Sequence, residues 1–401
     1  MRHCHPLTLF ALLIPISIVV ACTSKQTSGK LDCIASLIQE HPDSALATLR
    51  AIDTSALNSR SLRAYYSLLH AMALDKNWID TTDEAVIATA VAYYNKHPDL
   101  ERRAKAWYYL GRIQYNGHRY DEAILSFIQA AQWSTHLDDN RFKSLIFQAM
   151  GDTYGATSLY EEALSFSDSS VIYCLKAGDM PLANASQYRK AQNLNNLKRY
   201  HEADSIYRLL LSDTLVEGDT RLYARILSGY ALTVLGLEDD SAKARDLFEQ
   251  CLSQGRFDSY NHWGAYAYCL ASTGNRQKSE QIFERLRAMG LEDTFAYLGW
   301  KGRSEARHGK ANEAYALTAK AMDLQTETVR QTLRQSVIKA QLEHAEAKNV
   351  LLQEKANSRR LIVLLLLLLL SVWLPSLGGG SASAFGNRQK RRRLSWKTFQ
   401  N

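Results

Sequence analysis

The chain repeats itself at intervals close to forty residues, and this internal period limits the possible fold more than any other feature. The strings RYDEA, LYEEA and RYHEA are three of the copies. Their last residue marks a position that recurs at Ala123, Ala163, Ala203, Ala244, Ser279 and Ala314. The successive spacings are 40, 40, 41, 35 and 35 residues. Such a period is typical of repeats that stack on one another to bury a continuous core.

An aromatic residue follows the small residue of the motif by four positions in most copies. The aromatic positions are Phe127, Tyr207, Phe248 and Phe283, whereas the second copy has Ser167 there. A spacing of four places both residues on one face of a helix. The region shows no two-residue alternation of strands, so the repeats are predicted to be helical.

The clearest copy is AKAWYYLGRIQYNGHRYDEAILSFIQAA, residues 104–131, which resembles a tetratricopeptide repeat (TPR). The matching repeat-defining positions are Trp107, Leu110, Gly111, Tyr120, Ala123 and Phe127. The resemblance implies an all-α fold in which helix pairs stack into a right-handed superhelix, an α-solenoid. Gly111 and Ala123 are expected to be small because the two helices of the pair cross closely there. The copies predict about seven helix pairs over residues 31–325.

Residues 1–21 have the pattern of a secretory signal peptide. Arg2 precedes the apolar run LTLFALLIPISIVVA, and the segment has no acidic residue. The following VVAC resembles the lipobox of bacterial lipoproteins, which implies that Cys22 carries the lipid. A plain signal peptide followed by a chance cysteine is the alternative. Residues 22–30 are expected to be a linker to the repeats.

A second membrane segment is predicted near the other end of the chain. Residues 361–377 contain a run of seven leucines and no charge, and we expect a single transmembrane helix there. The tail at 378–401 carries six Lys and Arg residues and no acid, which predicts a cytoplasmic C-terminus. Residues 22–377 contain 41 basic and 41 acidic residues, so the net charge of +7 comes from Arg2 and the tail. Basic residues at these two places are explained by the predicted membrane topology and do not indicate a nucleic-acid partner.

Residues 326–360 are expected to continue the last repeat as a juxtamembrane stalk helix. Apolar positions with alternating spacings of four and three residues form a short heptad seam between Ile338 and Ala356. The seam would pair two protomers into a homodimer, or the helix would lie against the solenoid. The sequence leaves both arrangements open.

No catalytic, metal-binding or phosphate-binding motif occurs in the sequence. His118, His201 and His308 stand near predicted turns, where exposed polar residues are expected. The helical cysteines Cys33, Cys174, Cys251 and Cys269 are expected to be buried, with a disulfide between the last two as an alternative. We therefore expect neither an enzyme nor a cofactor.

The resemblance to TPR proteins implies that the first helix of each pair lines a groove that binds a peptide or a partner helix. The corresponding positions in this chain are Tyr108, Arg112, Tyr115, Asn116, Gln148, Asp152, Tyr188, Gln192, Asn196 and Tyr268. Polar and aromatic side chains suit hydrogen bonding to an extended backbone.

The order of segments resembles that of Bacteroidetes TPR membrane lipoproteins, in which a signal or lipobox precedes extracytoplasmic repeats and one span. Many of these proteins continue into a cytoplasmic regulatory domain, whereas only residues 378–401 follow the predicted span here, too few for such a domain. The resemblance implies a membrane-anchored periplasmic scaffold or sensor-type adapter at the cell inner membrane, with a protein or peptide partner. A glycan-binding lipoprotein and a truncated TPR-type transmembrane transcriptional regulator are the alternatives.

Overall fold

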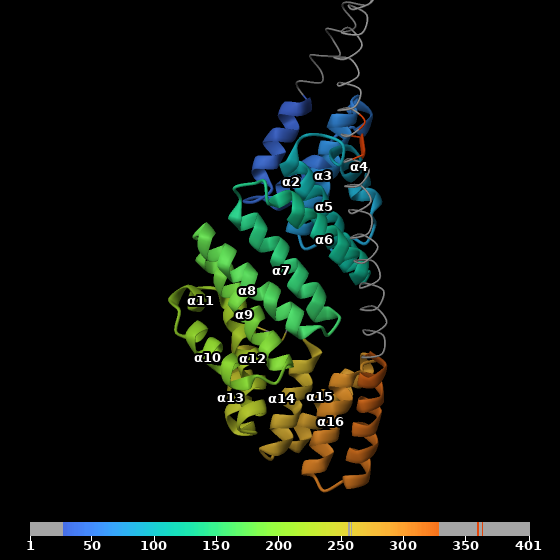
Figure 1. Cartoon of the computed structure of the whole chain (residues 1–401). Coiled ribbons are helices and arrows are strands. Elements are labelled where there is room, and N and C mark those ends of the chain that lie inside the picture. The colour runs from blue at the N-terminus through green and yellow to red at the C-terminus, as the bar shows by residue number, and fades with distance from the viewer. Residues whose placement is uncertain (1–26, 256, 258, 329–358, 361–362, 364–401) are drawn as a thin grey trace, which may run out of the picture. The chain divides into compact units, whose positions relative to one another are not determined.

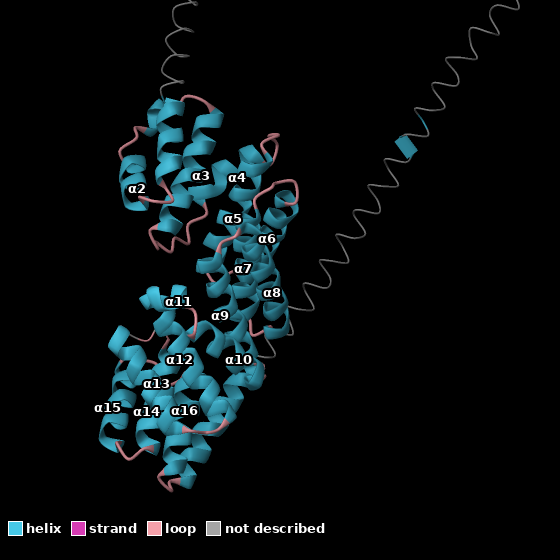
Figure 2. Ribbon diagram, turned by 90° about the vertical axis from the view of Figure 1, so that its left-hand side faces the viewer, coloured by secondary structure: helices cyan, strands magenta, loops and turns pink. Residues whose placement is uncertain are grey.

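A computed structural model of the chain describes residues 27–255, 257, 259–328, 359–360 and 363. Contacts divide the chain into one unit that ends at Thr332 and a second that covers Leu333–Asn401. The residues described in the first unit form helices and loops without a strand (Figure 2). The prediction of an all-helical repeat region is therefore confirmed.

The predicted membrane attachments fall largely outside the described residues. The signal peptide at 1–21 with Cys22, the heptad seam and the tail at 378–401 lie there, as does the span at 361–377 apart from Val363. No helix within the described part of the chain is long and apolar enough to cross a bilayer.

The helices of the first unit follow one another as antiparallel pairs (Figure 1). The pairs are residues 27–37 with α2 (Pro42–Arg50), α3 (Arg60–Lys76) with α4 (Ala85–Tyr94), α5 (Leu100–Asn116) with α6 (Tyr120–Ser134), α7 (Asn140–Ala156) with α8 (Tyr160–Ala177), α9 (Met180–Asn196) with α10 (Tyr200–Leu211), α12 (Thr220–Leu237) with α13 (Ser241–Gln254), α14 (Tyr260–Ser272) with α15 (Arg276–Ala288), and α16 (Phe295–Arg307) with residues 311–328. The described residues thus hold eight pairs, where about seven were expected. Residues 27–30, which were predicted to be linker, are helical.

Two short helices lie outside this scheme. The 3-10 helix η1 (Thr54–Ala56) connects the first two pairs, and α11 (Thr214–Gly218) lies between α10 and α12.

The turn within each pair repeats the period that the sequence shows. One residue there has a positive φ, between 49° and 93°, in seven successive pairs. These residues are Trp78, His118, Ser158, Lys198, Asp239, Gly274 and Gly309. From His118 onward each lies five positions before the small residue of the repeated motif. The positive-φ residues therefore recur at the same spacings as the small residues of the motif.

In the seven pairs from α3 onward, the first helix follows a residue whose side chain caps the helix N-terminus. The side-chain oxygen accepts a hydrogen bond from a backbone N–H two or three residues further on, which satisfies a group that the helix leaves unpaired. The capping residues are Ser59, Asp99, Asp139, Asp179, Asp219, Ser259 and Thr294. Six of the seven are spaced by forty residues, so the caps set the start of each repeat.

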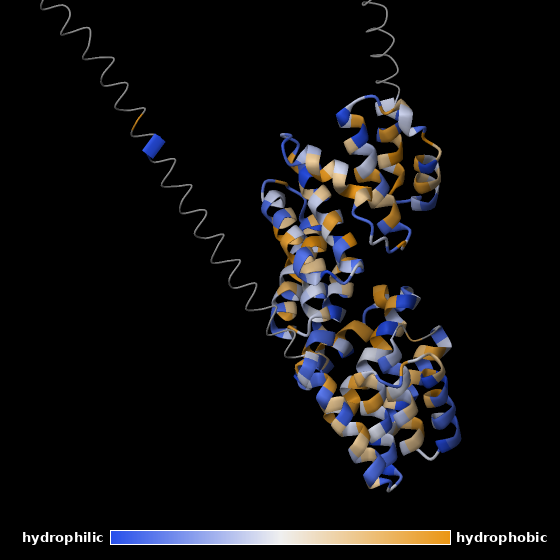
Figure 3. Ribbon diagram, turned by 90° about the vertical axis from the view of Figure 1, so that its right-hand side faces the viewer, coloured by the Kyte–Doolittle hydropathy of each residue, from blue (hydrophilic) through white to orange (hydrophobic). Residues whose placement is uncertain are grey.

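The repeated small and aromatic residues form the core. Ala123 and Phe127 are fully buried, and a Cβ added to Gly111 would lie only 2.6 Å from Cε1 of Phe127. This close crossing confirms the reason given for the small residues. Figure 3 shows hydrophobic and hydrophilic residues mixed along each helix, as expected of helices that bury one face.

The second copy lacks the aromatic residue, and its packing differs accordingly. Ser167 is buried, and its Oγ donates a hydrogen bond to the Ala163 carbonyl at 2.9 Å. The neighbouring Phe166 supplies an aromatic ring instead, stacked on Tyr154 with 5.2 Å between ring centroids. The substitution therefore brings a polar side chain into the core of this pair.

Candidate functional site

The first helices of four successive pairs contribute residues to one polar cavity of about 340 Å³, which we call the α7–α9 cleft. Tyr115 comes from α5 and Arg225 from α12, while α7 and α9 supply the remaining residues. The lining residues are Tyr115, Gly151, Asp152, Gly155, Ala156, Arg189, Gln192, Asn193, Asn196 and Arg225.

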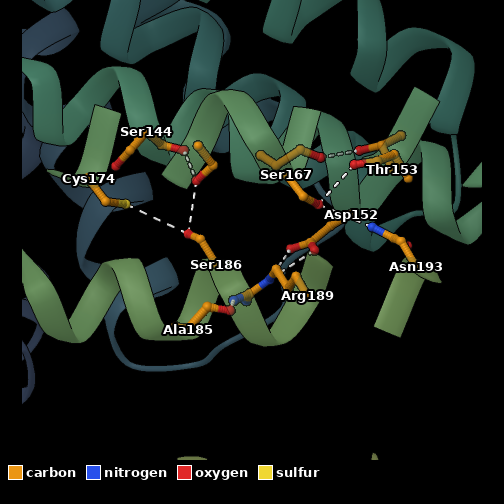
Figure 4. Close-up of polar contacts among 12 residues, drawn as sticks. Ser144, Asp152, Thr153, Ser167, Cys174, Ala185, Ser186, Arg189 and Asn193 are labelled. Atoms are coloured by element: carbon orange, nitrogen blue, oxygen red, sulfur yellow. Dashed lines mark hydrogen bonds and ion pairs between the residues drawn. The ribbon is translucent and has the colours of Figure 1, made fainter. Parts of the chain in front are cut away.

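An ion pair crosses the cleft. Nε of Arg189 on α9 donates a hydrogen bond to Oδ1 of Asp152 on α7 at 3.0 Å (Figure 4). Nη1 of Arg189 donates to the carbonyl of Ala185 at 3.2 Å, which fixes the guanidinium from the other side. Both side chains keep part of their surface exposed, 21% for Arg189 and 29% for Asp152. The pair is thus ordered and still reachable from solvent.

Two glycines of α7, Gly151 and Gly155, lie one helical turn apart and both line the cavity. Gly151 packs against α8, because a Cβ there would lie 3.3 Å from the Ala163 carbonyl oxygen and 3.5 Å from Cβ of Phe166. A Cβ on Gly155 would lie 3.6 Å from Oδ1 of Asn193 and 3.9 Å from Cβ of Ala163. The two glycines therefore let α7 pack closely against its neighbouring helices beside the cleft.

A polar seam lies beneath the cleft, between α7, α8 and α9 (Figure 4). Nδ2 of Asn193 donates a hydrogen bond to Oγ of Ser167 at 3.1 Å. Oγ of Ser170 donates to the Ser144 carbonyl at 3.1 Å and lies 3.0 Å from Oγ of Ser186. All five side chains are buried. The two largest apolar clusters end on either side of this seam, one reaching Met150 and the other beginning at Leu164.

Tyr115 and Arg225 border the ion pair from the flanking helices. Burial, followed by the charge of Asp152, raises the pKa of Tyr115 to about 12, so the hydroxyl keeps its proton at neutral pH. The Arg225 guanidinium lies 4.9 Å from the ring centroid of Tyr188. The cleft therefore offers hydroxyl, amide and guanidinium donors together with one carboxylate.

A second ion pair joins the first helices of the preceding repeats. Nε of Arg112 on α5 donates to Oδ1 of Asp75 on α3 at 2.9 Å. Burial by itself lowers the pKa of the Arg112 guanidinium, but Tyr108 and Asp75 outweigh it, so the pKa lies above its ordinary value. Asn116, one turn further along α5, donates to the Thr81 carbonyl at 3.3 Å.

A third polar group lies further along the chain and borders a separate cavity of about 430 Å³. The Tyr268 hydroxyl donates to Oδ1 of Asp239 at 3.1 Å and accepts from Nε of Arg307 at 3.2 Å. The hydrogen bond with Tyr268 is the main reason that the pKa of Arg307 is raised.

The structure brings together only part of the set predicted to bind a partner. Tyr115, Asp152, Gln192 and Asn196 line the α7–α9 cleft. Gln148 lies one turn before Asp152, and its buried Oε1 has no hydrogen-bond partner among the described residues. Arg112, Asn116 and Tyr268 belong to the two other polar groups described above.

Three predicted residues differ from expectation. Tyr108, Tyr188 and Tyr268 are 7%, 1% and 3% exposed, and all three belong to the apolar core. The rings of Tyr108 and Tyr188 fill space against Phe127 and Tyr207, respectively. Little of any of these side chains is open to a partner.

The cleft also contains residues that the sequence analysis did not single out, chiefly Arg189 and Arg225. For Arg189, the sequence does contain a pattern that could have predicted its role. Both ion pairs join an acidic residue to an arginine 37 positions later, Asp75 to Arg112 and Asp152 to Arg189. No such pattern in the sequence points to Arg225.

The cysteines and histidines do not form a site in the part of the chain that the structure covers. Cys174, Cys251 and Cys269 are buried, but Cys33 is exposed, which corrects the expectation for that residue. Cys269 is a free thiol, so the alternative of a disulfide with Cys251 is not realised, and burial raises the pKa of Cys269 to about 12. No group of three or more potential metal ligands occurs among the described residues.

No family model matches the sequence, and no curated protein matches it. Solved structures do resemble its fold. The structure of Rap protein complexed with competence and sporulation factor has a TM-score of 0.57 at 15% identity, covering 78% of this chain and 93% of that one. The apo form of the quorum sensor NprR from B. thuringiensis has a TM-score of 0.54 at 12% identity, covering 78% and 99%. NprR in complex with its cognate peptide NprX gives 0.52 at 13%, covering 73% and 83%.

At these identities the likeness shows the fold alone. Together with the repeated turn and the close crossing at Gly111, it shows that the chain forms an all-helical, TPR-like solenoid.

Proposed function

We propose that the protein binds an extended segment of a partner protein along the face formed by its first helices, as a scaffold or sensor-type adapter. The α7–α9 cleft carries this proposal, because four first helices converge there around an ion pair that remains partly exposed. Hydroxyl, amide and guanidinium donors suit the carbonyl groups of an extended chain.

The similar structures support this function by analogy. The Rap protein structure contains competence and sporulation factor, and one NprR structure contains the peptide NprX. Solenoids of this kind have extended surfaces that suit elongated partners.

Crosslinking in intact cells tests the proposal. A photoreactive amino acid at Gln192 should capture a protein, because this residue lines the cleft. The matched control is Leu209 on α10, a second helix, where the side chain is 67% exposed. Arg189→Ala should abolish the adduct formed from position 192. Equal adducts from both positions, or an adduct that survives Arg189→Ala, would contradict the proposal.

The proposed location is the cell inner membrane, with the repeats in the periplasm. It rests on the sequence: a lipobox that ends at Cys22, an apolar run at 361–377 and a basic tail at 378–401. A reporter fused after Asn401 should be active only as a cytoplasmic reporter, and Cys22→Ala should abolish labelling by a palmitate analogue. A periplasmic C-terminus would overturn this topology without affecting the proposed binding face.

A further inference from the structure

Another cavity among the described residues is larger than the α7–α9 cleft and separate from it. It has a volume of about 770 Å³ and lies between α13, α14 and α15. Volumes of this size are typical of sites that hold small molecules, which range from about 300 to 1,000 Å³.

The floor of the cavity is aromatic and aliphatic. Phe257 packs edge-on against Trp263 with 4.7 Å between ring centroids. Phe257, Tyr266 and Leu286 are 5%, 1% and 4% exposed, so they form a fixed apolar wall. Because these side chains are already shielded from water, the apolar surface that binding at this wall would remove from water is mainly that of the ligand itself.

The rim includes large apolar side chains that remain in solvent. Tyr260 is 57% exposed and Met289 is 51% exposed, and both line the cavity. They stand at the N-terminus of α14 and directly after α15. A ligand with an apolar body would cover both.

The charged side chains among the described lining residues are both cations, Lys278 and Arg285. Lys278 and Arg285 lie seven residues apart, which places them two turns apart on one face of α15. The described residues that line the cavity include no carboxylate.

A hydrogen-bond chain holds one of these cations in place. Nζ of Lys278 donates to the Tyr266 hydroxyl at 3.1 Å, and that hydroxyl donates to Oε1 of Glu249 at 3.2 Å. Glu249 is thus bonded to the hydroxyl on the far side, while the ammonium group retains two further donors for a ligand.

From this combination we infer that the cavity binds a single-chain anionic amphiphile, namely a long-chain fatty carboxylate. The chain lies on the floor formed by Phe257, Trp263 and Leu286, and the carboxylate pairs with Lys278 or Arg285. A neutral or cationic amphiphile lacks the partner that these two side chains require. The inference is independent of the proposed partner binding, which uses first helices of earlier repeats.

Photolabelling of the full chain in intact membranes tests this inference. The probe is a long-chain fatty acid that carries a diazirine on the chain and a terminal alkyne. We expect the label on peptides from residues 252–289, and at least fivefold less of it in the double variant Lys278→Ala/Arg285→Ala. Ile282→Asp, which places a negative charge in the cavity lining, should remove the label.

Matched controls separate charge recognition from simple partitioning. Arg276→Ala removes an exposed cation of the same helix that does not line the cavity, and it should label as the wild type does. The same probe with an alcohol in place of the carboxylate should label at least fivefold less. Arg189→Ala should leave labelling unchanged even if it abolishes partner capture. Thermal melting of each variant shows that it is folded.

Three results would overturn the inference: no label on residues 252–289, equal labelling by the alcohol probe, or wild-type labelling of the folded double variant. Each of these leaves the proposed partner binding untouched.

Discussion

Arg189 on α9 contacts Asp152 on α7 at 3.0 Å, although the two residues are 37 positions apart in the chain. The contact joins the first helices of consecutive repeats at the place where the apolar core gives way to a polar seam. The contact places two charged groups at the mouth of the cleft.

The coupling between these two side chains should be measurable but small. We expect a double-mutant cycle of Asp152→Asn and Arg189→Ala to give a coupling of about 1 kcal/mol in the free energy of unfolding, because both groups remain partly exposed. Denaturant unfolding at neutral pH measures it. A coupling indistinguishable from zero would mean that the pair does not hold the repeats together.

The crossing of α5 and α6 should tolerate no side chain at Gly111. Gly111→Ala places a methyl group 2.6 Å from the Phe127 ring and should destabilise the protein by about 1–3 kcal/mol. Gly299→Ala is the matched control, because Gly299 lies within α16 with nothing inside 4 Å of an added Cβ. The control should stabilise by about 0.5–1 kcal/mol. Equal effects of the two substitutions would refute the close crossing.

The turn inside each pair should prefer glycine. Lys198 has a φ of 60°, so Lys198→Gly should raise the free energy of unfolding by about 1 kcal/mol. Gly274 has a φ of 93°, and Gly274→Ala should lower it by a similar amount, since an added Cβ would have open space and only the backbone is strained. Thermal melting of both variants checks the opposite signs.

A buried charge cluster near the end of the repeats should make the free energy of unfolding depend on pH in the acidic range. Nζ of Lys301 lies 2.6 Å from Glu280 and 2.7 Å from Glu305, which is only 3% exposed. Burial would raise the pKa of Glu305, but the hydrogen bond and charge of Lys301, then those of Lys310, hold it below the ordinary value.

A carboxyl whose pKa is lowered by folding stabilises the protein above its unfolded pKa, and this stability is lost as the pH falls through the folded pKa. Glu305→Gln should therefore cost about 2 kcal/mol at pH 7, and progressively less below about pH 4. The exposed Glu313→Gln serves as control and should change stability by less than about 0.5 kcal/mol. A difference between Glu305→Gln and wild type that is as large at pH 3 as at pH 7 would contradict this account.

The repeat period was predictable because the recurring small residues all have the same structural role, which is to let two helices pack closely. Ala123, Ala203 and Ala244 are all fully buried, and the aromatic residue four positions later is buried in each case. The capping residues carry the same period, since Asp99, Asp139 and Asp179 are forty positions apart. A search for N-caps would have located the start of each repeat, and the earlier residue Ser59 would have marked the pair formed by α3 and α4.

The proposed binding face was less predictable from the sequence. The repeat motif predicts which helix a residue belongs to. It does not predict how that helix is rotated about its axis, and this rotation determines whether the side chain is exposed or buried. Tyr188 and Gln192 were predicted on the same ground, yet the first packs in the core and the second lines the cleft. Cavities such as the one between α13 and α15 depend on how neighbouring pairs stack, which the sequence of a single repeat does not encode.

The affinity of the captured partner segment for the full chain tests the central claim most directly. A synthetic peptide of the segment crosslinked from Gln192 would be titrated against wild type, Arg189→Ala and the control Leu209→Ala. We predict that Arg189→Ala raises the Kd at least tenfold, which corresponds to about 1.4 kcal/mol, and that Leu209→Ala leaves it unchanged. The same Kd for all three proteins would contradict binding at the α7–α9 cleft.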